Sequence, residues 1–259
     1  MSKAVDFHIK ELEGMKKYPK ELFFVGNNTL LEKKKIAIIG SRKPNQYARH
    51  KTDELAKKLS YRGVCIVSGG AIGVDAIAHK AAGTNNTIMI AATGLDKHYP
   101  AINKKLIEQI EDEGLVLSQF SEGSPSTRYN FVLRNELVVA LGDVLIVTYA
   151  DLNSGSMRSV EFALGMGKEI YVLAHRIGES EATNRLLQEG KAKAIYDIDD
   201  FIKELMGEAI NDKESSDDFL AFCKTNPTYD EVLKKFPTKV FEAELSGEII
   251  VNNGTILLA

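Results

Sequence analysis

The chain has 259 residues, of which 44% are hydrophobic and 27% charged, a composition typical of a globular protein with room for one large core and a small second domain. This balance excludes a chain that is disordered throughout, and a net charge of −3 excludes a general attraction to polyanions, so any nucleic-acid site must be local. The first twenty residues lack an apolar signal core, and no run of about 18 apolar residues occurs. We therefore expect a cytoplasmic protein without a membrane span.

Short apolar runs rich in Ile and Val alternate along the chain with stretches of helical period. This alternation is typical of repeated strand–helix units around a parallel sheet. The predicted strands are residues 35–39, 64–67, 87–91, 115–118, 143–148, 169–173 and 194–196. The predicted helices are residues 47–62, 74–83, 101–113, 131–141, 157–166, 183–189 and 198–206. We expect an α/β fold with an extended, Rossmann-like, doubly wound and mostly parallel sheet.

Composition divides the chain into four parts. A short lead-in segment, residues 1–34, precedes the first strand, and the doubly wound domain follows over residues 35–206. Residues 207–216 lose most of their apolar side chains and are typical of a linker. Over residues 217–259, short helical stretches precede two strand-like runs that flank Asn252-Asn253-Gly254, a strong hairpin signal. Helices followed by a hairpin predict a small winged-helix-like C-terminal domain.

Glycine and serine follow several predicted strands, directly ahead of helices. In an open α/β sheet, ligands bind beyond the carboxyl ends of the strands, where free N–H groups and the helix dipole attract anions. A row of such helix starts suits a ligand with more than one phosphate. The residues concerned are Gly40, Ser41, Ser68, Gly69, Gly70, Ser154, Gly155 and Ser156.

Five of the eight arginines fall in or beside these loops, namely Arg42, Arg128, Arg134, Arg158 and Arg176. A planar guanidinium matches a phosphate and can stack on a base, so this placement favours phosphate contact, above all for Arg42. For Arg134 and Arg158, which lie inside predicted helices, structural ion pairs are the alternative. Phe131, close to Arg128, is a candidate for stacking an unpaired base, with packing in the core as its alternative.

Signals for catalysis are sparse. The chain has no G-x-x-x-x-G-K-[ST] motif, and Gly69, Gly70 and Gly73 do not form G-x-G-x-x-G. No histidine has a metal-ligand partner at the usual spacing, and His79 is expected to be a packed or capping group. We predict no catalytic residue, no metal and no cofactor.

Two carboxylates and two thiols complete the candidates. Asp75 and Glu161 lie near glycine-containing helix starts, where a buried carboxylate could serve hydrolysis of a nucleotide glycosidic bond. Asp75 has the alternative of holding the start of its helix. Cys65 and Cys223 are far apart in sequence and lack a Cys/His cluster, so we expect buried free thiols.

Five motifs, in this order, give the chain a family resemblance over roughly residues 15–205: IAIIGSR (36–42), SGGAIGVDAIAH (68–79), GLDKHYPAIN (94–103), FVLRNE (131–136) and SGSM (154–157). They resemble the motifs of the DprA/Smf family, a family of proteins that act in natural transformation. The resemblance implies a non-enzymatic protein that binds single-stranded DNA, protects incoming DNA, works as a homodimer and helps to load the recombinase RecA. Residues 35–206 would then be the DNA-binding domain.

The same resemblance assigns a DNA-binding surface. SGGAIG would be a backbone cradle for the phosphates of single-stranded DNA, and Phe131 would occupy the base-stacking position. The chain departs from the family at Arg134-Asn135-Glu136, where the family usually has a third, positive residue. The implied DNA-binding residues are Gly40, Ser41, Arg42, Ser68, Gly69, Gly70, Ala71, Arg128, Phe131, Arg134, Asn135, Ser154, Gly155 and Ser156.

A nucleotide-processing enzyme with a related core, of the phosphoribohydrolase type, is the alternative function. Its signature, P-G-G-x-G-T-x-x-E, is not matched, because the corresponding loop reads Ser154-Gly155-Ser156 and Glu161 lacks the glycine pair. A nucleotide-sensing module is a third interpretation. A DNA binder should need several nucleotides, whereas an enzyme or a sensor should hold a mononucleotide tightly.

Overall fold

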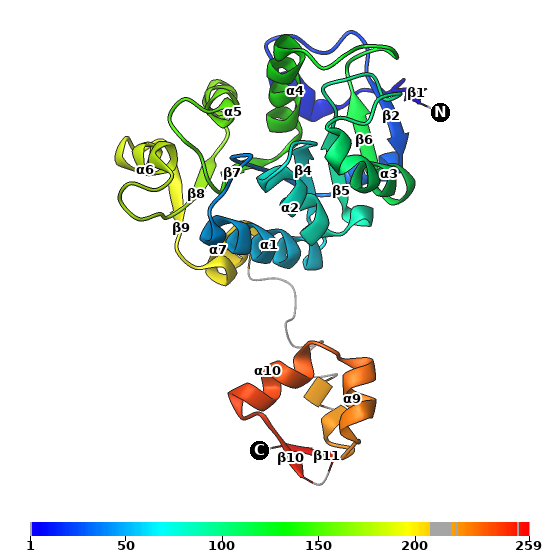
Figure 1. The fold of residues 1–259 in the computed structure, drawn as a ribbon, viewed down its shortest axis with the longest axis vertical. Coiled ribbons are helices and arrows are strands. Elements are labelled where there is room, and N and C mark those ends of the chain that lie inside the picture. The colour runs from blue at the N-terminus through cyan, green and yellow to red at the C-terminus, as the bar shows by residue number, and fades with distance from the viewer. Residues whose placement is uncertain (1, 208–218, 221, 253, 259) are drawn as a thin grey trace. The chain divides into compact units, whose positions relative to one another are not determined.

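The computed structural model describes residues 2–207, 219–220, 222–252 and 254–258 (Figure 1). The chain divides into two compact units, Met1–Ile202 and Lys203–Ala259. The first is an α/β unit with a mostly parallel sheet, which confirms the predicted fold class. Of the predicted linker, residues 208–216 lie outside the described residues.

The sheet of the first unit has nine strands in the order β1-β2-β6-β5-β4-β3-β7-β8-β9. The strands from β6 to β9 in this order are parallel to one another, whereas β2 is antiparallel to both β6 and β1. The bounds are β1 Lys3–Ala4, β2 Phe23–Gly26, β3 Lys35–Ile39, β4 Cys65–Gly69, β5 Thr87–Ile90, β6 Leu115–Ser118, β7 Val144–Val147, β8 Ile170–Leu173 and β9 Lys193–Ile195.

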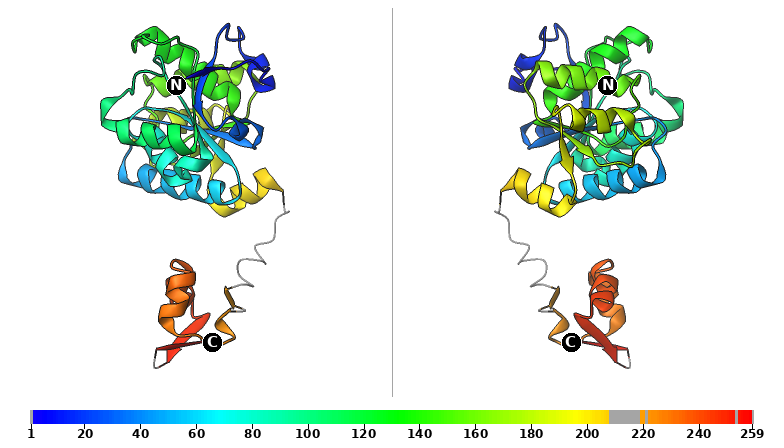
Figure 2. Two further views of the ribbon diagram at one scale, coloured as in Figure 1. Left: turned by 90° about the vertical axis from the view of Figure 1, so that its right-hand side faces the viewer. Right: turned by 90° about the vertical axis from the view of Figure 1, so that its left-hand side faces the viewer.

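Helices cover both faces of this sheet (Figures 1 and 2). They are α1 Gln46–Tyr61, α2 Val74–Ala82, α3 Lys104–Glu113, α4 Arg128–Leu141, α5 Gly155–Gly165, α6 Glu181–Gln188 and α7 Ile198–Met206. Side chains that alternate along each strand divide between two layers. Ala37 and Ile39 pack with α4, α5 and α6, whereas Met89 and Val116 pack with α2 and α3 on the other face.

The predicted strands and helices of this unit are all present, within three residues of their predicted bounds. Side-chain hydrogen bonds at the starts of α1 and α4 explain why these helices begin where they do. The Asn45 side chain accepts a hydrogen bond from Ala48 N at 2.8 Å, and the Thr127 side chain accepts one from Asn130 N at 3.1 Å. Both are N-caps that satisfy N–H groups which the helix itself cannot.

The first 34 residues are built into the sheet and its core, an arrangement that the sequence pattern did not indicate. Strand β2 pairs with β6, and Leu12 and Leu30 are buried in the main core. Lys35 is also buried, and its Nζ donates to the carbonyls of Leu31 at 2.6 Å and Lys33 at 3.0 Å. These bonds and an ion pair with Glu11 compensate the buried ammonium.

The second unit has helices α9 Tyr229–Lys235 and α10 Lys239–Ser246 and a hairpin of β10 Ile249–Asn252 and β11 Thr255–Leu258. Gly254 in the turn has φ +77°, a conformation that favours glycine. Helix α9 begins with a capping box in which Thr228 and Glu231 bond each other's backbone. The helices and hairpin were predicted, and the winged-helix assignment stays a prediction.

Both cysteines are buried free thiols, as predicted, Cys65 in the sheet and Cys223 in the core of the second unit. Burial raises the pKa of the Cys65 thiol to about 12. In the part of the chain that the structure describes, no helix has the length and apolar character needed to cross a bilayer.

The buried N-terminal segment leads to a stability prediction. Leu12→Ala would leave a cavity in the main core, so we expect the free energy of unfolding to fall by about 2–5 kcal/mol. Leu164→Ala, on the exposed side of α5, is the matched control and should change it by less than about 0.5 kcal/mol. Urea denaturation of both variants measures the difference, and equal effects would show that the segment is not part of the core.

Candidate nucleic-acid interface

The carboxyl ends of β3, β4 and β7 meet the middle of α4 and the first turn of α5 at a hollow of about 390 Å³, here called the main cleft. Strands β4 and β7 flank β3 on opposite sides, so the cleft lies where the strand order reverses, the usual ligand position in a doubly wound sheet. Eleven of the fourteen predicted binding residues line it: Gly40, Ser41, Arg42, Gly69, Ala71, Phe131, Arg134, Asn135, Ser154, Gly155 and Ser156.

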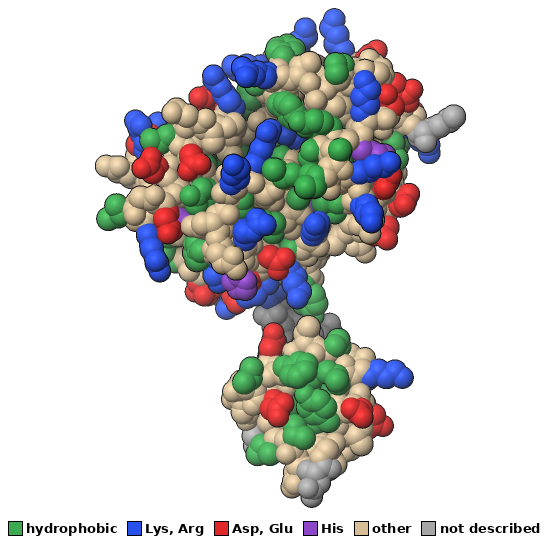
Figure 3. Space-filling model, in the orientation of Figure 1, with side chains coloured by type: hydrophobic (Ala, Val, Ile, Leu, Met, Phe, Trp, Pro, Cys, Tyr) green, Lys and Arg blue, Asp and Glu red, His purple; other side chains and the backbone are tan. Residues whose placement is uncertain are grey.

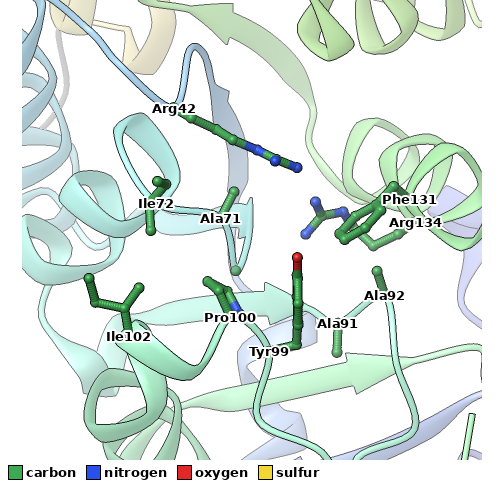
Figure 4. A pocket seen from close by; sticks show the side chains of 11 residues that line it. Arg42, Ala71, Ile72, Ala91, Ala92, Tyr99, Pro100, Ile102, Phe131 and Arg134 are labelled. Carbon is green, nitrogen blue, oxygen red and sulfur yellow. The ribbon is translucent and has the colours of Figure 1, made fainter. Parts of the chain in front are cut away.

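The loop after β3 is anchored through its backbone, which leaves its arginine free to project. Ser41 N donates to Tyr149 O at 2.8 Å, and Ser41 O accepts from Val74 N at 3.2 Å. A Cβ on Gly40 would lie 2.6 Å from Val74 Cγ2, so the loop could not approach α2 as closely with any other residue. Arg42 is exposed, and its side chain extends toward Arg134 and Phe131 (Figure 4).

The end of β4 and the turn after it contain both structural residues and residues that line the cleft. Ser68 is fully buried and its hydroxyl donates to Ile38 O at 2.6 Å, so its side chain joins two strands and does not line the cleft. Gly69 and Ala71 do line it. His79 is buried behind the turn, with its Nε2 2.7 Å from Gly69 O, which confirms the predicted packed role. Burial lowers the pKa of His79 to about 4, so the ring stays neutral near pH 7.

Arg134 and Asp75 form the floor of the cleft, where each is only 6% exposed. Burial raises the pKa of the Asp75 carboxyl and lowers that of the Arg134 guanidinium, and the opposite charge of each partner counteracts both shifts. Arg134 Nη1 donates to Ile90 O at 3.0 Å, and its Nε donates to Asn135 Oδ1 at 3.1 Å. The two charges flank Gly69, where a Cβ would lie 2.0 Å from Arg134 Nη1 and 2.6 Å from Asp75 Oδ2.

The start of α5 supplies the third side of the cleft. Asn135 Nδ2 donates to Gly155 O at 3.4 Å, which joins α4 to the first turn of α5. Ser154 Oγ is buried and has no hydrogen-bond partner among the described residues. The first N–H groups of an α-helix have no partner within the helix, so this turn and the Ser154 hydroxyl offer donors to an anion.

An apolar pocket of about 180 Å³ adjoins the main cleft and shares Arg42, Ala71, Phe131 and Arg134 with it (Figure 4). Gly70, the twelfth predicted residue, lines this pocket. Its other walls are Ile72, Ala91, Ala92, Tyr99, Pro100 and Ile102. The structure thus joins a polar hollow to an apolar one through residues common to both.

Phe131 stands between the two hollows. The guanidinium carbons of Arg42 and Arg134 each lie 5.7 Å from the centre of its ring, within cation–π range. Tyr99 packs on it at 5.7 Å with the rings tilted by 54°. Tyr99 was not among the predicted binding residues, although it lies in the family-like motif of residues 94–103. An aromatic residue in a loop that follows a strand was the available signal.

Several sequence candidates lie outside both hollows. Arg128 is exposed at the start of α4 but lines neither. Glu136, at the family's usual third position, is buried on another side of α4 and accepts from Lys16 N at 2.9 Å, so its charge holds the N-terminal segment. Arg158 and Glu161 pair with each other at 2.8 Å on the exposed side of α5, the structural role considered for Arg158.

The site can hold anions and flat apolar groups side by side. On the face drawn in Figure 3, Lys and Arg side chains lie beside apolar side chains over the region between α4 and α2. Within the described ranges, no group of three or more His, Cys, Asp or Glu side chains could hold a metal ion. The groups in the cleft that can bind an anion include the exposed side chains of Arg42 and Lys43, the start of α5 and serine hydroxyls.

A substitution at Gly69 tests how tightly Arg134 and Asp75 are packed at the floor of the cleft. Gly69→Ala would force Arg134 and Asp75 apart in a packed site, so we expect a loss of about 1–3 kcal/mol in the free energy of unfolding. Gly155→Ala is the control, because a Cβ there meets open space. Thermal denaturation compares the variants, and a Gly69→Ala protein as stable as the control would show that the floor is loosely packed.

Comparison with known proteins places this geometry in a family. The model of the family described as DNA recombination-mediator protein A matches residues 5–206. DNA processing protein DprA of Streptococcus pneumoniae is 35% identical over 190 residues, which cover 72% of this chain and 67% of that protein. DNA processing protein DprA of Bacillus subtilis is 32% identical over 192 residues, covering 72% of this chain and 64% of that protein. The chain thus matches about two thirds of the length of these relatives.

A solved structure of DNA processing protein A from Helicobacter pylori, described for its single-stranded DNA binding mode, has the same fold. Its TM-score is 0.79 at 40% identity, over 81% of this chain and 98% of that chain. With the family model covering most of the first unit, the chain belongs to the DNA recombination-mediator protein A family.

Proposed function

We propose that this protein binds single-stranded DNA across the main cleft and the apolar pocket, and that it acts by binding and not by catalysis. The observation that carries the proposal is the union of the two hollows through Arg42, Phe131 and Arg134. A nucleotide has one anionic and one flat apolar part. The junction would place its phosphate on the polar side and its base on the apolar side.

The polar side supports binding to a backbone of several phosphates. Arg42 and Lys43 are exposed at its rim, and the first turn of α5 faces the same hollow. Arg134 is charged but buried beside Asp75, so its part is to shape the floor and flank the Phe131 ring. Contacts of this kind read phosphates and not the identity of a base.

The apolar side supports binding to an unpaired base. Phe131 and Tyr99 line one pocket with Ala71, Ala92 and Pro100, and a base would have to leave its stack to place its face against their rings. A base in a duplex is stacked and paired and presents only its edge in a groove. The relative from Helicobacter pylori, described for its single-stranded DNA binding mode, supports the same ligand class.

The family resemblance supplies the finer parts of the proposal. These are action in natural transformation in the cytoplasm, protection of incoming DNA, assembly as a homodimer and loading of RecA recombinase. They are inferred from membership of the DNA recombination-mediator protein A family, and the chain matches about two thirds of the length of the relatives compared.

A phosphoribohydrolase would need a carboxylate beside the reacting bond. Glu161, its candidate, is 61% exposed, pairs with Arg158 and lies outside the cleft. The carboxylates that do line the cleft are Asp75, which is buried beside Arg134, and Asp151. This placement favours binding over hydrolysis, and we infer that nucleoside monophosphates are not cleaved.

Affinity for three ligand forms tests the proposal. We expect tighter binding to a single-stranded oligonucleotide than to its duplex or to a mononucleotide, because the cleft needs several phosphates and an open base face. Fluorescence anisotropy on one purified sample measures all three. Equal affinity for the duplex, or tight binding of the mononucleotide with release of free base, would overturn it.

Variants of Arg42 and Phe131 should both bind single-stranded DNA more weakly, but with different salt dependence. Arg42→Ala removes one phosphate contact, so we expect weaker binding and a log–log salt slope lower by about 0.7 for a single strand. Phe131→Ala should lose about 1–3 kcal/mol of binding free energy with an almost unchanged slope, because stacking releases no counterions.

Arg158→Ala is the matched control, since it removes an exposed arginine that lies outside the cleft. Its salt slope should equal that of the unaltered protein. Melting temperatures of the three variants separate lost binding from unfolding. An unchanged salt slope in Arg42→Ala would show that Arg42 does not contact a phosphate. A stable Phe131→Ala protein with full affinity would show that Phe131 does not stack on a base.

A further inference from the structure

Another hollow lies at the same edge of the sheet, on the far side of the loop that carries Arg42. It has a volume of about 390 Å³ and is lined by residues 45–47 at the start of α1 and by residues 174–176 and Glu179 after β8. Ser41 N bonds Tyr149 O at 2.8 Å, and the Tyr149 ring lies 5.3 Å from that of His175. The hollow is therefore one residue layer away from the main cleft.

The imidazole of His175 is fixed in this hollow in a single orientation. Its side chain is fully buried, and the rings of Tyr47 and Tyr149 meet it edge to face at 5.4 Å and 5.3 Å. Nε2 lies 2.8 Å from Thr148 O. Because a carbonyl can only accept, Nε2 carries the hydrogen and Nδ1 of the neutral ring presents a lone pair.

That Nδ1 lone pair is buried without a hydrogen-bond partner among the described residues. It faces Glu179 Oε2 at 4.0 Å, and the same carboxylate oxygen accepts from Asn45 Nδ2 at 3.2 Å. The Asn45 amide is held in turn, because its Oδ1 caps α1. Two acceptors thus face one gap, and it is unfavourable for the buried one, His175 Nδ1, to stay unpaired.

The gap fits a nitrogen that donates two hydrogens. An atom about 2.9 Å from each acceptor bridges it at normal hydrogen-bond length. The exocyclic amino groups of cytosine, adenine and guanine have this form, whereas thymine carries the acceptor O4 at the corresponding position. Tyr47, which is 43% exposed, offers a ring for stacking, and Arg176 at the rim is exposed.

We propose that this hollow is a second nucleobase site, which takes the amino group of cytosine, adenine or guanine between His175 Nδ1 and the Glu179 carboxylate and discriminates against thymine. The inference rests on the proposed single-strand binding, because a strand that leaves Arg42 along residues 43–45 reaches the hollow. Since the imidazole is sealed, entry requires the surface side chain of Tyr47 or Arg176 to turn outward.

The test uses an oligothymidylate in which a single dC is moved one position at a time. We expect one or two positions at which dC raises the affinity about tenfold over the all-dT strand, the size of one hydrogen bond to a charged group. Glu179→Gln should abolish this preference, because the amide places donors where the carboxylate accepted. Glu181→Gln, which alters an exposed carboxylate two residues away, is the control and should keep it.

Melting temperatures establish that both variants are folded. Binding of dT strands with the same affinity for every dC position would overturn the second site and leave single-strand binding intact. Loss of the preference in both glutamine variants alike would also overturn it, since the effect would then follow net charge. Absence of binding to any strand would defeat the proposed function, and this inference with it.

Discussion

A guanidinium and a carboxylate buried together hold the centre of the cleft. Removing such charges from water costs several kcal/mol per ion, so the pair is stable only where each charge compensates the other and further hydrogen bonds are made. Arg134 has Ile90 O and Asn135 Oδ1, and Asp75 Oδ2 accepts from Ala71 N at 3.4 Å. The group thus links α4, α2, β5 and the turn after β4. The shape of the cleft is set before a ligand arrives, provided that residue 69 is glycine.

Because the charge of Asp75 opposes that of Arg134, the two arginines of the cleft have different roles. The charge of Arg134 is already opposed by Asp75, and its guanidinium has little contact with solvent. Arg42 lies exposed on a loop whose backbone is tied to Tyr149 and Val74, so its charge is available to an incoming anion. Both cations lie near the Phe131 ring, which keeps the aromatic face beside positive charge. Phosphate affinity and base stacking would therefore be coupled through one side chain.

The parallel sheet was predictable because its strands are buried on both faces and read as continuous apolar runs. Strand β2 was missed because FFVG is short and pairs antiparallel with β6, a contact between segments far apart in sequence. Eleven of the fourteen residues that the family resemblance implied line the cleft, and those that follow predicted strands were also indicated by glycine, serine and arginine ahead of helix starts. The sequence could not show that the Ser68 side chain is buried between strands or that Tyr99 packs on Phe131. Whether a side chain after a strand turns inward depends on the neighbouring strands.

The chain has no general positive charge, so any attraction to DNA would be local. The chain carries −3 overall, and residues 217–259 hold four lysines against seven carboxylates. In a helix-turn-helix protein the second helix of the motif enters the major groove. In the predicted winged-helix-like domain α10 would be this helix, and it exposes Phe241 and Leu245 and carries Glu242 and Glu244 beside a single Lys239. The exposed side chains of α10 are thus mostly apolar or acidic, whereas the exposed cations Arg42 and Lys43 line the main cleft of the first unit.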